Sequence, residues 1–124
     1  MIEYTVKVWA NGTKKEWYLN GRCHREGGLP AVEWADGSKL WYLNDKRHRE
    51  DGPAYEGADG SKEWYLNDKL HREDGPAVER PDGSKEWWLN GKRVTEEDVM
   101  GPKAEELTVA EISRRLGYAI KIVK

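Results

Sequence analysis

The chain has 124 residues, of which 35% are charged and 37% are hydrophobic, with a formal net charge of −2. This length predicts one domain, no apolar run is long enough for a membrane-spanning helix, and the charge balance argues against a general nucleic-acid-binding protein. Seven Trp and six Tyr occur without any Phe. Flat aromatic layers therefore fit the composition better than a thick aliphatic core, and an elongated β array is favoured over a β-sandwich.

A four-residue aromatic phrase recurs along the chain, at 17–20, 41–44, 64–67 and 87–90, with lead tryptophans 24, 23 and 23 residues apart. A period of this length indicates a repeat protein, in which each unit buries its apolar face against its neighbours. We expect a β-repeat array over residues 1–102, with units near 9–33, 34–56, 57–79 and 80–102. The first and last units are irregular, as terminal repeats usually are.

Two kinds of turn dipeptide alternate with short runs rich in Trp, Tyr and Val. Asn-Gly or Asn-Asp follows each Trp-Tyr-Leu, and Asp-Gly precedes Ser-Lys; both tolerate the positive φ of tight hairpin turns. The predicted fold class is mainly β: a continuous antiparallel meander of about four 23-residue hairpin repeats, with about two strands per unit. A C-terminal helix and strand make the fold α+β overall.

Strand alternation divides the aromatic side chains between two faces. We assign the Trp and Leu stripe, which includes Trp17 and Leu19, to the core, and we expect the second aromatic of each phrase to be more exposed. This exposed stripe could be a cross-strand ladder that stabilises the sheet, a protein-binding row or a platform for a nucleotide or nucleic acid. With flanking lysines, the predicted binding residues are Tyr18, Tyr42, Tyr65, Trp88, Lys39, Lys62 and Lys85.

The repeat pattern ends after Arg93. Thr95 is expected to start a short helix, residues 101–103 read as a linker, and residues 103–124 form a predicted helix–strand cap. Thr108 and Glu111 have the spacing of a capping box, with Leu107 and Ile112 as a hydrophobic staple, and Gly117 is expected to end that helix. Residues 118–123 then alternate as a strand. This tail either caps the last unit and covers an open sheet edge, or offers that edge to a partner.

His24, His48 and His71 recur with the repeat, and each is followed by Arg-Glu. As metal ligands they would have to converge within about 2.1 Å of one ion, which successive units do not allow. We therefore expect each histidine to hydrogen-bond the neighbouring unit. The Arg-Glu-Asp sequences are interpreted as an inter-unit ion-pair ladder with turn-forming Asp, because a catalytic carboxylate pair needs two unlike environments.

Cys23 is the single cysteine, so it rules out an internal disulfide and suits a reducing compartment. His24 is adjacent to it in sequence. Neighbouring residues of a strand point to opposite faces, so this adjacency does not indicate a nucleophile–base pair. We predict a cytoplasmic protein that is not an enzyme and uses neither a metal nor a cofactor.

The unit Asp-Gly-Ser-Lys-Glu-Trp-Tyr-Leu-Asn…His-Arg-Glu-Asp-Gly-Pro-Ala, repeated over about residues 11–93, resembles a variant of the MORN repeat, a family of short β-hairpin units. The His-Arg-Glu-Asp-Gly-Pro-Ala form resembles small repeat proteins encoded by bacteriophages and other viruses, and the tail resembles tails of small phage proteins. The usual Gly-x-Gly turn of MORN units is replaced here. Lipid binding, sometimes proposed for MORN arrays, is not expected, because residues 1–102 carry 20 acidic against 16 basic side chains.

The phage resemblance implies a protein that binds and inhibits a host protein, such as a bacterial defence component, inside the bacterial cell. Two alternatives stay open: a sponge that sequesters a nucleotide signal, and a structural repeat in a virion or larger complex. A homodimer formed through exposed strand edges is also open.

Overall fold

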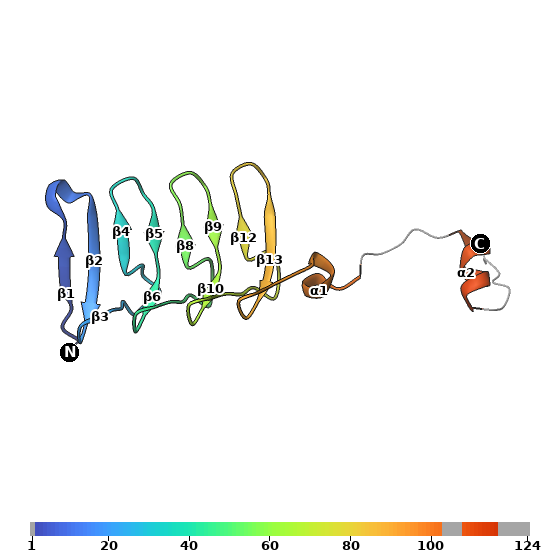
Figure 1. Ribbon diagram of the computed structural model, residues 1–124, viewed down its shortest axis with the longest axis horizontal. Coiled ribbons are helices and arrows are strands. Elements are labelled where there is room, and N and C mark those ends of the chain that lie inside the picture. The colour runs from blue at the N-terminus through green and yellow to red at the C-terminus, as the bar shows by residue number, and fades with distance from the viewer. Residues whose placement is uncertain (1, 103–107, 117–124) are drawn as a thin grey trace.

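The computed structural model describes residues 2–102 and 108–116. It confirms a mainly β, antiparallel hairpin meander, drawn in Figure 1 as tall hairpins that stand side by side in chain order. The continuous sheet has the strand order β1-β2-β4-β5-β8-β9-β12-β13-β14, with β3 paired to β2. Its strands are β1 (Thr5–Val8), β2 (Lys14–Leu19), β3 (Arg22–Cys23), β4 (Val32–Trp34), β5 (Lys39–Leu40), β8 (Tyr55–Glu56), β9 (Lys62–Glu63), β12 (Val78–Glu79), β13 (Lys85–Leu89) and β14 (Lys92–Val94).

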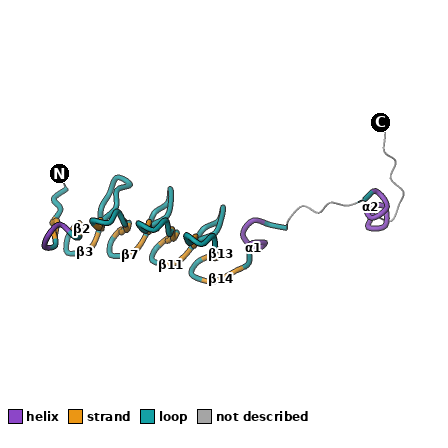
Figure 2. Tube along the Cα trace, turned by 90° about the horizontal axis from the view of Figure 1, so that it is seen from above, coloured by secondary structure: helices purple, strands orange, loops and turns teal. Residues whose placement is uncertain are grey.

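The two inner units add a second, smaller hairpin each. One pairs β6 (Tyr42–Leu43) with β7 (Lys46–Arg47), and the other pairs β10 (Tyr65–Leu66) with β11 (Lys69–Leu70). Figure 2 shows β7, β11 and β14 following one side of the array. The strand predicted through the Trp-Tyr-Leu phrase is divided at Trp41, whose N–H donates to Ala54 (2.7 Å) while its carbonyl accepts from His48 (3.1 Å). Trp41 thus joins the two hairpins of its unit.

The two turn dipeptides adopt different conformations. In the smaller hairpin Asn44 and Asp45 both have positive φ, 50° and 66°, as the tight two-residue turn requires. In the tall hairpin only Gly37 is left-handed, with φ 97°, and Trp34 N–H reaches the carbonyl of Ser38 at 2.9 Å. The Asp-Gly segment is therefore a three-residue loop ending in a left-handed glycine, which corrects the predicted two-residue turn.

An alternating charge ladder crosses the sheet on one face. Lysine and glutamate stand opposite each other on every neighbouring pair of strands from β2 to β13, in the order Lys15, Glu33, Lys39, Glu56, Lys62, Glu79, Lys85. Cross-strand pairs of opposite charge stabilise a sheet by about 0.2–1 kcal/mol each, whereas like charges would oppose pairing. The ladder therefore fixes the register between units without needing a thick core.

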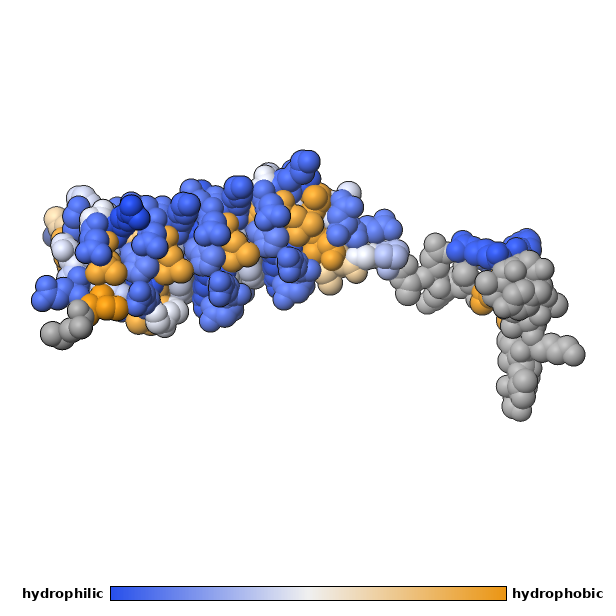
Figure 3. Space-filling model, turned by 90° about the horizontal axis from the view of Figure 1, so that it is seen from below, coloured by the Kyte–Doolittle hydropathy of each residue, from blue (hydrophilic) through white to orange (hydrophobic). Residues whose placement is uncertain are grey.

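The core is a row of small clusters rather than one centre. Three alanines, Ala31, Ala54 and Ala77, have no exposed surface, and their carbonyls accept the N–H of Trp17, Trp41 and Trp64 at 2.7–2.8 Å. One cluster contains Cys23, Ala31 and Val32, and the next contains Trp41, Ala54 and Tyr65. From below, polar ridges alternate with apolar patches along the array (Figure 3). Stacked units thus bury small clusters at the first two junctions.

Helices flank the repeats. A 3-10 turn, η1 (Ala10–Gly12), joins β1 to β2. The short helix predicted at Thr95 is confirmed as α1 (Glu96–Met100), with a capping box between Thr95 and Asp98, and it lies against β13. The second is confirmed as α2 (Val109–Leu116), where Glu111 N–H donates to the Thr108 hydroxyl at 3.2 Å.

The predicted staple residue Leu107, the stop at Gly117 and the strand over 118–123 lie outside the described residues. Within the part of the chain that is described, no helix has the length and apolarity needed to cross a membrane.

Candidate binding clefts

Each of the first three units places an arginine flat over its own tryptophan. The guanidinium carbon lies 3.9 Å from the ring centroid in the pairs Arg25–Trp17, Arg49–Trp41 and Arg72–Trp64. The arginine always follows the tryptophan by eight residues, because the small hairpin returns the chain beside its own start. A cation over an indole face is worth about 0.5–1 kcal/mol at a partly exposed site.

The hydrogen bonds of these arginines close inside their own units. Arg49 donates from Nη1 to the Pro53 carbonyl and to Glu56, both at 3.1 Å, and from Nε to Asp51 at 3.1 Å. Arg72 repeats these bonds to the corresponding carbonyl and carboxylates of unit three. The inter-unit ion-pair ladder predicted for the Arg-Glu-Asp sequences is therefore wrong for these arginines: the pairs close within one unit, because the loop folds back on its own strand.

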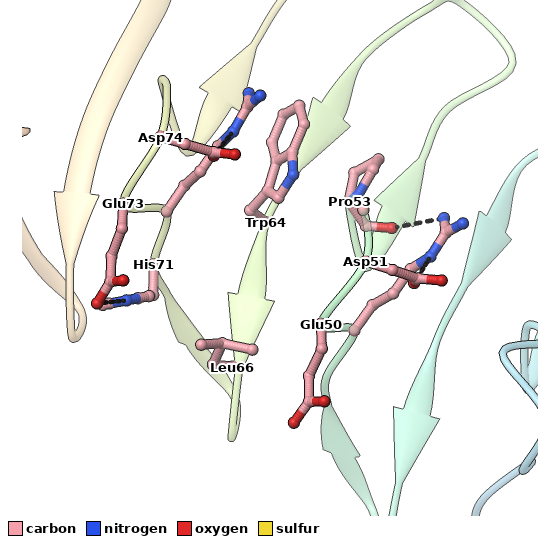
Figure 4. A pocket seen from close by; sticks show the side chains of 11 residues that line it. Glu50, Asp51, Pro53, Trp64, Leu66, His71, Glu73 and Asp74 are labelled. Carbon is pink, nitrogen blue, oxygen red and sulfur yellow. Dashed lines mark hydrogen bonds and ion pairs between the residues drawn. The ribbon is translucent and has the colours of Figure 1, made fainter. Parts of the chain in front are cut away.

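A cleft opens where two successive loops face each other; the loop of unit one reads Arg25-Glu26-Gly27, and those of units two and three read Arg-Glu-Asp. The first cleft, of about 440 Å³, has Trp41 and Leu43 between the loops of units one and two. The second cleft, of about 650 Å³, has Trp64 and Leu66 between the loops of units two and three. Figure 4 shows Trp64 standing between the loop of Asp74 and the loop of Asp51 and Pro53. The two clefts are thus related but not identical, since Trp41 in the first is only 7% exposed and donates from Nε1 to the Gly28 carbonyl at 3.0 Å. The loop of unit two is a wall of both.

Carboxylates dominate the rim of the second cleft. Its walls hold two arginines against four acidic groups, and Glu50, Asp51, Glu73 and Asp74 keep 76–87% of their side-chain surface exposed. The guanidinium of each arginine already donates hydrogen bonds to a carbonyl and to two carboxylates. What the cleft offers to a ligand is therefore mainly carboxylate acceptors and an indole ring. Such a site suits a cationic or amphipathic group and is unfavourable for a phosphate.

The repeated histidines fix one unit against the next, as the sequence predicts. The Nδ1 atoms of His24, His48 and His71 each accept a 2.9 Å hydrogen bond from the backbone N–H of the Asn that opens the next small turn. The other ring nitrogen faces a glutamate two residues on, at 3.3–3.5 Å. Each ring therefore takes the tautomer with the proton on Nε2. Among the described residues, no group of three or more His, Cys, Asp or Glu is placed to hold a metal.

The tyrosine stripe is not the exposed face that alternation suggests. Tyr65 is buried, with 8% of its surface exposed, and Tyr18 and Tyr42 pack on the first core cluster. The hydroxyl of Tyr18 donates to Glu16 at 2.7 Å, and Trp88 donates from Nε1 to Glu86 at 2.9 Å. The expected exposure is wrong for Tyr65, because the preceding unit covers it, an effect that alternation within one strand does not include. In unit two the expectation holds, since Tyr42 is half-buried and Trp41 is buried.

The three predicted lysines do not accompany the tyrosines. Lys39, Lys62 and Lys85 are exposed, but they belong to the charge ladder, each opposite a glutamate on the adjoining strands. Alternation directs them to the face opposite Tyr42 and Tyr65. The structure therefore does not bring the seven predicted binding residues together.

Titration in this region follows burial and hydrogen bonding. Burial raises the pKa of the Cys23 thiol to about 11, so the thiolate needed for a nucleophile is scarce at neutral pH. The hydrogen bond to Glu16 raises the pKa of Tyr18 to about 12. The Arg47 side chain, bonded to Asp68 at 2.6 Å between two units, lowers the pKa of that carboxyl group. Each of these pKa shifts arises from burial or from a hydrogen bond that holds the fold together.

The clefts were missed at the sequence level, although one signal was available. The constant interval of eight residues between Trp and Arg marks a pair that the hairpin brings together. No arginine stands eight residues after Trp87, so the series of Arg–Trp pairs ends with unit three. Comparison of the chain with protein-family models, with curated proteins and with solved structures finds no match. The resemblance to MORN repeats and to phage proteins accordingly stays a prediction.

Proposed function

We propose that the protein is a non-enzymatic binding module that engages another protein through the two clefts. The observation that carries the proposal is a pair of related clefts: each has a tryptophan, a leucine and an acidic rim between two successive loops, although the loop of unit one has Gly27 where the later loops have Asp51 and Asp74. A partner that contacts both clefts gains from two weak sites at once, which raises affinity without a deep pocket.

We propose that the protein binds a host protein and inhibits it by occupying its surface, as the phage resemblance suggests. A stoichiometric inhibitor needs a binding surface of complementary shape and no catalytic groups. The clefts supply such a surface without a nucleophile or a polarised acid–base pair. The proposed surface differs from the tyrosine stripe, since Tyr65 is buried in the core. A nucleotide sponge is less well supported, because the cleft arginines already pair with carboxylates of their own units.

The proposal is tested by affinity capture from bacterial lysate with quantitative mass spectrometry. The variant Asp51→Asn/Asp74→Asn removes two exposed charges from the clefts, and Glu3→Gln/Glu97→Gln removes the same charge elsewhere. A partner captured by wild type and by the Glu3/Glu97 variant, but lost with Asp51 and Asp74, supports the clefts as the site. Equal capture by all three proteins overturns it. A nucleotide released by heating, with no protein partner, supports the sponge instead.

A further inference from the structure

The distance between the two clefts follows from the sheet. Each unit contributes two hydrogen-bonded strands to one continuous sheet, so equivalent positions in units two and three are two strand spacings apart. Strands lie about 4.8 Å apart, which sets the cleft period at about 9–10 Å along the array. A ligand that fills both clefts must therefore present its contacts at this interval.

The chain conformation of the ligand is restricted by that interval. A polyproline II segment returns every third side chain to the same side after about 9.3 Å. A β-strand returns every second side chain after about 6.6 Å, too short for one unit. An α-helix repeats at seven residues, about 10.5 Å, but it is about 10 Å wide and would not enter between loops one unit apart.

The chemistry of the second cleft complements a basic side chain, and the first cleft offers three carboxylates, Glu26, Glu50 and Asp51, against two arginines. Arg72 covers one face of Trp64 at 3.9 Å, and the indole stands between that arginine's loop and the loop of Pro53 (Figure 4). Its remaining face and the carboxylates of Asp51 and Asp74 are cleft walls. A lysine or arginine stem packs on the ring while its charge reaches the rim. Pro53, on the loop that separates the clefts, offers a flat surface for a proline of the ligand.

We infer that the partner presents an extended, polyproline II-like segment with Lys or Arg three residues apart, one for each cleft. This inference rests on the proposed function, in that it names the partner segment which the same two clefts hold. The segment runs along the array, across the strands, and its backbone passes over the loop of Arg49 to Pro53. Asp51 lines both clefts, as do Arg49 and Glu50 of the same loop.

The spacing is tested with two fluorescent nonapeptides of identical composition and charge. One, Pro-Lys-Pro-Pro-Lys-Pro-Pro-Lys-Pro, has lysine at every third position; the other, Pro-Pro-Pro-Lys-Lys-Lys-Pro-Pro-Pro, has three adjacent lysines. At low salt the first is expected to bind about five to ten times more tightly, since it fills two clefts and the second fills one. Asp51→Asn should remove most of that difference, and Glu97→Gln, which lies outside both clefts, should preserve it.

Equal affinity of the two peptides, or a preference that survives Asp51→Asn, overturns the inference. An Ala-rich helical peptide with lysine at every seventh position that binds better than both also overturns it, in favour of a helical segment. If neither peptide binds while a captured partner still depends on Asp51 and Asp74, the proposed function stands and only the spacing fails. If capture of the partner does not depend on Asp51 and Asp74, the proposed function of the clefts is overturned as well.

Discussion

His48 accepts, at ring nitrogen Nδ1, a 2.9 Å hydrogen bond from the backbone N–H of Asn67 in the following unit. The same bond joins His24 to Asn44 and His71 to Asn90. The bond reaches the first residue of the turn of the next small hairpin. The histidine therefore joins two units beside the backbone bonds Arg49 N–H to Tyr65 and Asp68 N–H to Arg47, and its removal should loosen the array at one defined junction.

His48→Ala is expected to lower the free energy of unfolding by about 1–3 kcal/mol, because the amide of Asn67 loses its acceptor and the ring leaves a gap. Urea denaturation followed by Trp fluorescence measures the change. His48→Asn is the matched control, since its Oδ1 can take the position of Nδ1, and it should recover part of the loss. Equal losses for both substitutions would show that ring packing, and not the hydrogen bond, joins the units.

Gly75 leaves room for the arginine of the same loop. A Cβ atom at this position would lie 2.6 Å from Cζ of Arg72, which must then leave the face of Trp64. Gly75→Ala is therefore expected to destabilise the protein by about 1 kcal/mol. In an Arg72→Ala background the same change should stabilise by about 0.5 kcal/mol, since Gly75 does not need a positive φ.

Thermal or urea unfolding of the four proteins of this double-mutant cycle checks the reversal of sign. Gly52→Ala offers a second comparison, because its Cβ would meet Cζ of Arg49 at 3.0 Å and should cost less. If Gly75→Ala has the same effect with and without Arg72, the glycine serves the backbone and not the arginine.

The unit and the Asn-Asp turn of its small hairpin are predictable from the sequence because they depend on residues close together in the chain, whereas the length of the Asp-Gly loop was predicted wrongly. The period of the Trp-Tyr-Leu phrase, the left-handed Asn44 and the cap at Thr95 all follow from local chemistry. The role of the histidines is also predictable, since a side chain repeated once per unit in a stack has the next unit as its neighbour.

The burial of Tyr65 was not predictable, because it depends on packing against the preceding unit. Tyr65 alternates with Trp64 along one strand, yet Tyr65 is the buried residue, since it joins the core cluster of Trp41 and Ala54. The clefts require two loops from different units and the return of Arg49 onto Trp41. The lysines were grouped with the tyrosines by sequence proximity, while the register assigns them to the charge ladder.

Tyr18 makes stability dependent on pH in the alkaline range. The hydrogen bond to Glu16 raises its folded-state pKa to about 12, whereas an unfolded tyrosine titrates near 10. Because the folded pKa is the higher one, the stabilisation is fully present below about pH 10 and is lost as the pH rises toward 12. Tyr18→Phe should therefore be less stable than wild type at pH 8, with the difference narrowing above pH 10.

Urea midpoints of both proteins at pH 8, 10 and 11.5 test this prediction. Tyr42→Phe is the control, because Leu40 occupies the place of the glutamate in that unit and burial is the main cause that raises the pKa of Tyr42. Its difference from wild type at pH 8 should be smaller than that of Tyr18→Phe. A difference for Tyr18→Phe that stays constant from pH 8 to 11.5 would contradict the role assigned to its hydrogen bond.

Cys23 should behave as a structural thiol. It is 7% exposed, and burial raises its pKa to about 11, so at pH 8 the thiolate is about a hundredfold rarer than in the unfolded chain. Reaction with a disulfide reagent is expected to be at least that much slower in the native protein than in 8 M urea. Unit three carries Leu70 at the equivalent position, so Cys23→Leu should fold and retain any partner bound through the clefts. Native reaction at the unfolded rate would instead mean an accessible thiolate, and a nucleophilic role for Cys23 would then have to be tested.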